Sequence, residues 1–107
     1  MAEEDVRLAC APRSFRVLPG EPVRVELKIQ TRSAAPVRLH VPEHSLLMLR
    51  AVEKFPVQRT REGAVVHKRV LNWQALEPGT AKVTGLSVET PGGKRMFPEI
   101  EITVRAP

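Results

Sequence analysis

The chain has 107 residues, enough for one hydrophobic core but not two, and its hydrophobic content of 42% is typical of globular rather than disordered proteins. Its ten prolines argue against long helices, because an interior proline removes a backbone hydrogen bond and clashes with the preceding turn. The net charge of +5 comes from basic residues scattered among acidic ones, and no segment approaches the roughly 20 apolar residues of a membrane-spanning helix, so we expect no membrane insertion.

Alternating apolar and polar residues predict strands from the start of the chain. Residues 6–10 and 15–17 alternate on either side of Pro12, a pattern typical of an edge strand that is divided between two sheets. Residues 22–30 show the clearest alternation, with one apolar and one charged or polar face, and a Leu-Pro-Gly-Glu turn precedes them. This segment is therefore the most clearly predicted strand.

The middle of the chain continues the strand pattern less regularly. Residues 37–41 alternate until a proline ends the segment, and the apolar stretch 46–52 is predicted as a short strand or a helical turn. Residues 64–76 form a long predicted strand. Its apolar residues change from even-numbered to odd-numbered positions (a change of parity) between Val70 and Leu71, which predicts a β-bulge at that point.

The last third of the chain predicts a hairpin. Gly85 marks a second change of parity and predicts a bulge, while the Pro-Gly-Gly-Lys sequence at 91–94 predicts a hairpin turn. The final strand, 96–104, is expected to carry Met96 and the isoleucines inward and its glutamates outward.

The spacing of these segments predicts the fold class. Seven to eight short strands, with turn residues about every ten positions, favour an all-β, immunoglobulin-like antiparallel sandwich. The sequence contains no repeat, linker or low-complexity tract, so we expect a single domain over 1–107, with the ends at 1–5 and 106–107 frayed.

Three stretches of sequence resemble a known class of domains. Residues 20–25 are similar to the Gly-Glu-Pro-Val motif that begins the second strand of bacterial immunoglobulin-like domains, and residues 76–80 resemble their Leu-x-Pro-Gly-Thr corner. The pattern over 83–104 is most similar to domains of the aerotolerance (BatD-type) membrane proteins. The resemblance implies a non-catalytic interaction or spacer module of a larger exported bacterial protein, in the periplasm or at the cell surface. Such proteins carry an export signal and a membrane anchor that this sequence lacks, so two alternatives stay open: a domain excised from an exported protein, or a cytoplasmic protein.

The residues that could carry chemistry do not form a convincing catalytic set. His40, Glu43 and His44 match the H-x-x-E-H string of inverted zinc peptidases, but Pro42 would break the helix that this mechanism requires. The only aspartate is Asp5, and no serine lies in a G-x-S-x-G sequence. We therefore expect neither an enzyme nor a cofactor, and a metal-dependent protein that uses the two histidines and Glu43 is the third hypothesis.

Apolar residues near the middle of the chain are the candidate partner-binding site. Four consecutive apolar residues cannot all face one core from a strand, because alternate side chains point outward. We therefore predict that a protein partner or neighbouring domain docks on Leu46, Leu47, Met48, Leu49 and Phe55. Trp73, in phase with its apolar neighbours, is expected in the core, and a surface anchor is the alternative.

The basic balance of the sequence supports a second hypothesis for function. A nucleic-acid or polyanion binder would use a basic surface, and its affinity would fall steeply with added salt. The sequence disfavours nucleic acid, because it contains no run of basic residues and few aromatic residues for base stacking.

Overall fold

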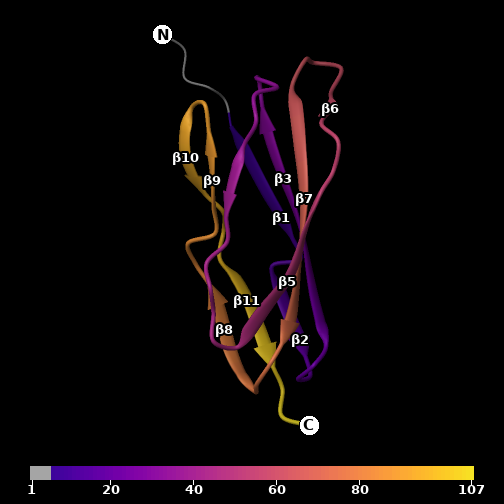
Figure 1. The fold of residues 1–107 in the computed structure, drawn as a ribbon, viewed down its shortest axis with the longest axis vertical. Coiled ribbons are helices and arrows are strands. Elements are labelled where there is room, and N and C mark those ends of the chain that lie inside the picture. The colour runs from indigo at the N-terminus through magenta and orange to yellow at the C-terminus, as the bar shows by residue number, and fades with distance from the viewer. Residues whose placement is uncertain (1–5) are drawn as a thin grey trace.

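The computed structural model describes residues 6–107, so the predicted fraying of residues 1–5, with Asp5, lies outside the described residues. Within this range the chain forms eleven strand segments and no helix (Figure 1). Consequently no helix between residues 6 and 107 is long and apolar enough to cross a bilayer. The strands are β1 (Arg7–Ala11), β2 (Ser14–Val17), β3 (Pro22–Thr31), β4 (Arg38–His40), β5 (Leu47–Lys54), β6 (Gln58–Arg59), β7 (Val65–Ala75), β8 (Gly79–Val83), β9 (Ser87–Thr90), β10 (Gly93–Met96) and β11 (Ile100–Val104).

The first sheet is antiparallel, with the order β1-β3-β7-β5, and the short β6 also pairs with β7. Its centre is the long pair β3 and β7, which are in continuous register from Thr31 opposite Val65 to Pro22 opposite Gln74. The apolar face of β3 is fully buried, as its alternation predicted. One side of this sheet therefore faces the core and the other faces solvent.

The second layer is divided into two halves, β10-β9-β4 and β2-β11-β8. The division falls at Gly85, which has a positive φ of 86°, and at residues 97–99 of the facing segment. A hydrogen bond of 2.8 Å from the Phe97 N–H to the Leu86 carbonyl crosses the interruption. Each interrupted strand is counted as two segments, and this raises the number above the seven to eight predicted.

Two details of the predicted strands are wrong. The bulge expected between Val70 and Leu71 is absent from the β3–β7 ladder, because β7 keeps one parity throughout and turns His67 and Arg69 toward the core side. Met96 is 54% exposed instead of inward-facing, because strand β10 ends at this residue and the next side chain, that of Phe97, is buried instead.

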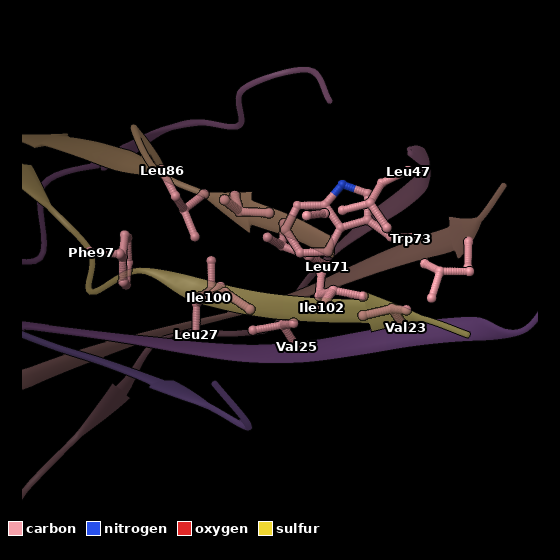
Figure 2. Packing of buried hydrophobic residues seen from close by; sticks show 14 of the residues in the cluster. Val23, Val25, Leu27, Leu47, Leu71, Trp73, Leu86, Phe97, Ile100 and Ile102 are labelled. Atoms are coloured by element: carbon pink, nitrogen blue, oxygen red, sulfur yellow. The ribbon is translucent and has the colours of Figure 1, made fainter. Parts of the chain in front are cut away.

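The core lies between the two layers and is built mainly from branched aliphatic side chains, with Trp73 and Phe97 as its aromatic members (Figure 2). Val25 and Leu27 from β3 and Ile100 and Ile102 from β11 meet across it and are fully buried. Burial of such residues is the main stabilising term of a domain of this size.

Candidate functional site

A largely apolar hollow of about 470 Å³ lies beside the connection between β4 and β5. Three parts of the chain form it: that connection, the first residues of β5, and the end of β7 with the residue that follows. The residues that line it are Val41, Pro42, Glu43, His44, Leu47, Met48, Leu49, Trp73 and Leu76.

The floor of the hollow belongs to the core. Trp73 is 3% exposed and Leu47 is 6% exposed, and both are members of the central apolar cluster (Figure 2). The prediction that Trp73 packs in the core is therefore confirmed. Because its indole also borders the hollow, a side chain that entered the hollow would meet a rigid aromatic surface.

The rim of the hollow leaves apolar area in water. Met48 is 44% exposed, Leu49 40% and Leu76 39%. Leu49 pairs with Trp73 in the β5–β7 ladder, so it lies on the core side of the sheet. It remains exposed because β5 is the edge of this sheet. Apolar area of this kind loses its contact with water when a complementary surface covers it.

The backbone wall of the hollow is ordered by His44. The Leu46 N–H donates to His44 Nδ1 over 3.1 Å, and the Leu47 N–H donates to the His44 carbonyl over 3.2 Å. Because Nδ1 is an acceptor, the proton of the neutral ring lies on Nε2. The structural contribution of His44 is therefore to stabilise the turn before β5 by accepting these two hydrogen bonds.

The edge strand carries a bulge next to the rim. The β5–β7 register shifts between Leu49 and Ala51, with Arg50 as the extra residue. Its Nη1 lies 3.4 Å from Met48 Sδ, so a positive charge stands beside the apolar rim. A bulge and a charge on an edge strand both discourage the addition of another strand. The arrangement favours docking through side chains over extension of the sheet.

The five residues predicted as the partner-binding site fall into separate places. Leu47, Met48 and Leu49 line the hollow. Leu46 is half-buried against the core on another side, and Phe55 is half-buried on the outer face of the first sheet, with Lys68 Nζ 4.7 Å from its ring centre. The structure thus brings three of the five together.

Sequence reasoning missed the other half of the hollow. The sequence predicted Val41 as the end of one strand and Leu76 as the end of another, and it did not indicate that Pro42 and His44 would line a surface with them. The sequence signal was the nearness of this Pro-containing loop to the apolar stretch that follows it. His40 ends β4 and is exposed, and among residues 6–107 no group of three or more His, Cys, Asp and Glu side chains could hold a metal ion.

A buried histidine lies elsewhere, under the connection between β3 and β4. His67 is 2% exposed, and its Nε2 lies 3.4 Å from the hydroxyl of Thr31, which itself donates to the Ser33 carbonyl over 2.7 Å. Burial lowers the pKa of His67, and the positive charges of Arg69 and Lys54 lower it further, against a hydrogen bond with the backbone of Ser33. The neutral ring is therefore the form that the fold accommodates.

Comparisons with known proteins identify the class of fold. No known protein family matches the sequence, and no curated protein matches it. A solved structure does match: the BIgI domain of beta protein from S. agalactiae bound to CEACAM1, with a TM-score of 0.61 and 14% sequence identity over 96% of this chain and 99% of that one. The fold is immunoglobulin-like.

This likeness confirms the predicted fold class. It also supports the similarity to bacterial immunoglobulin-like domains that the sequence motifs indicated, whereas the comparison provides no link to the aerotolerance family. At this level of identity the match establishes the immunoglobulin-like sandwich and leaves the site to be argued from its own residues.

Proposed function

We propose that this immunoglobulin-like domain is a non-catalytic module that binds another protein through the hollow beside β5. The observation that supports this most strongly is the exposure of Met48, Leu49 and Leu76 around a floor formed by Trp73. Buried aromatic surfaces ringed by flexible apolar side chains suit a docked apolar anchor. The partner we propose carries a large apolar side chain for the hollow, and a carboxylate beside it would meet Arg50.

The structural neighbour is consistent with this role. The BIgI domain is bound to CEACAM1, so a sandwich with similar architecture docks on a protein. The sequence resemblance adds the proposal that the present domain is an interaction or spacer unit of a larger exported bacterial protein. The extended shape of the domain, 52 × 24 × 18 Å along its principal axes, suits such a unit.

Site-specific photo-crosslinking tests the proposed docking surface. Benzoylphenylalanine would replace Met48 in one protein and Met96 in another, and both would be expressed in cells of the source organism. Met96 is the matched control, because it is also an exposed methionine but lies on β10, in the second layer. We expect a discrete crosslinked band from position 48 that is absent from position 96.

A second substitution establishes that the contact needs the apolar rim. Leu49→Asp puts a charge at a 40% exposed position, so the fold should survive while docking is lost. The thermal unfolding midpoint of Leu49→Asp confirms that the protein is folded. Equal crosslinking from positions 48 and 96, or a band that persists in the folded Leu49→Asp protein, would refute the proposal.

A further inference from the structure

Two lysines face each other on the solvent side of the first sheet. Lys28 in β3 lies directly opposite Lys68 in β7, and both side chains are partly exposed, at 58% and 37%. Like charges directly opposite each other destabilise a sheet. Among the described residues they share one carboxylate, that of Glu26, whose Oε1 lies 3.7 Å from Lys28 Nζ and whose Oε2 lies 3.7 Å from Lys68 Nζ. The pair therefore keeps an excess of positive charge.

A hollow of about 360 Å³ opens over this pair of lysines. We call it the basic hollow. The ladder places Ala9, Lys28 and Lys68 in one row across three strands, and Arg7, Gln30 and Val66 in the next. The short β6 extends the second row, since Gln58 pairs with Val66. Four strands therefore contribute to one site whose members are scattered along the sequence.

The lining of the basic hollow combines charge, amides and an apolar floor. Its basic members are Arg7, Lys28 and Lys68, and none of the described residues that line it is acidic. Gln30 and Gln58 add amide groups, which both donate and accept hydrogen bonds. The apolar side chains on this face are those of Ala9 and Val66.

Lys68 is held at the edge of the basic hollow by an aromatic ring. Its Nζ lies 4.7 Å from the centre of the Phe55 ring, and the Phe55 N–H donates to the Lys68 carbonyl over 3.3 Å. A cation over the face of a ring is attracted to it and loses rotational freedom. The amine is thus partly positioned before any ligand arrives.

We propose that the basic hollow binds carboxylates of an acidic segment in a partner protein. A carboxylate between Lys28 and Lys68 would relieve their repulsion, which Glu26 alone offsets only in part. The two glutamines suit peptide groups, and the apolar floor suits the methylenes of acidic side chains. Nucleic acid fits less well, since none of the described lining residues is aromatic and the face of the nearby Phe55 ring is already occupied by Lys68 Nζ.

This site is independent of the apolar hollow beside β5, because the two share no lining residue. Each can therefore fail without the other. The folded Leu49→Asp protein should keep its affinity for an acidic peptide, whereas substitutions in the basic hollow should leave crosslinking at position 48 unchanged.

The test is a titration of the ¹⁵N-labelled domain with hexaglutamate whose two termini are blocked. The chemical shifts of the backbone amides report the binding. We expect the largest shifts at Ala9, Lys28 and Lys68. The double variant Lys28→Gln/Lys68→Gln should weaken binding about fivefold, as two partly exposed charge contacts would. The matched control is Lys82→Gln/Lys94→Gln, which makes the same change in net charge at exposed positions of the second layer and should retain the affinity.

Two further measurements separate a binding site from a structural charge pair and from other anions. Lys28→Gln alone should lower affinity without lowering the thermal unfolding midpoint, because it removes the repulsion and leaves the Glu26–Lys68 pair. Sialyllactose and an oligothymidylate, titrated at the same ionic strength, should bind more weakly than hexaglutamate. Equal losses in both double variants, or tighter binding of the sugar or the oligonucleotide, would overturn the proposal.

Discussion

The side chain of Leu46 occupies the space where Gly79 would carry a Cβ. A Cβ at Gly79 would lie 2.8 Å from Leu46 Cδ1, and the glycine has a positive φ of 148°. The Leu76 N–H also donates to the Leu46 carbonyl over 2.9 Å. These contacts fasten the connection that precedes β5, and with it one wall of the apolar hollow, to the turn that precedes β8.

The first prediction follows from this contact. Gly79→Ala should lower the free energy of unfolding by about 1–3 kcal/mol, since it strains the backbone and displaces Leu46. Gly20→Ala is the control, because Gly20 also has a positive φ but would place its Cβ in open space. Urea unfolding of both variants checks this. Equal losses in the two variants would show that Leu46 adds nothing to the cost.

The second prediction concerns the aromatic floor. Trp73→Ala should destabilise the domain by about 3–5 kcal/mol, because it leaves a cavity among residues that cannot fully close it. Trp73→Phe should cost less, since it retains part of the ring volume. Thermal or urea unfolding followed by circular dichroism measures both. A loss below about 1 kcal/mol for Trp73→Ala would contradict the place of this residue in the core.

The third prediction is a dependence of stability on pH through His67. Its pKa in the folded domain lies below the ordinary value of 6.5, so the unfolded chain takes up the proton first as the pH falls. The stabilisation is therefore fully present above pH 6.5 and is lost as the pH falls from there toward the folded pKa. His67→Gln removes this titration.

The measurement is the free energy of unfolding of the wild type and His67→Gln from pH 8 to pH 5. The stability of the wild type relative to the variant should fall with decreasing pH over this range. His40→Gln, at an exposed position, is the control and should follow the wild type. Parallel curves for the wild type and His67→Gln would refute the account of the buried ring.

The fourth prediction concerns the thiol of Cys10. Burial raises its pKa above 9.0, although the charge of Arg13 acts in the opposite direction. At pH 8 the folded domain should therefore react with a disulfide reagent more slowly than the unfolded chain, since the thiolate is the reactive form. Arg13→Gln should slow the reaction further. A faster reaction in the variant would contradict the electrostatic contribution of Arg13.

Much of the architecture could be predicted because alternation directly reports which face of a strand is buried. Residues 22–30 are the clearest case, where each apolar residue of the pattern is buried in β3. The parity of β7 could not be predicted, because His67 and Arg69 face the core side while Val66 and Val70 lie on the opposite face, where Val70 is nevertheless fully buried. A polar side chain is expected on the solvent face, and this expectation fails where a nearby polar group allows the side chain to be buried, as the hydroxyl of Thr31 does for His67.

The site could be predicted only in part, for a similar reason. The run of consecutive apolar residues at 46–49 indicates that some of its side chains are exposed, and Met48 and Leu49 are indeed exposed. It does not indicate which distant residues complete the surface, so Leu76 and the loop at 41–44 were missed. The lysine pair of the basic hollow was also invisible, because Lys28 and Lys68 are 40 positions apart in the sequence and become neighbours only through the β3–β7 register.

The parallel pairing of β2 with β11 has a mechanical consequence. β1 begins toward one end of the long axis and β11 ends toward the other (Figure 1). A force that pulls these two ends apart acts along β2 and β11, whose register runs from Ser14 opposite Glu101 to Val17 opposite Val104. Their hydrogen bonds would be sheared together, not opened one after another as in a pulled hairpin. This geometry resists extension of the domain along its long axis.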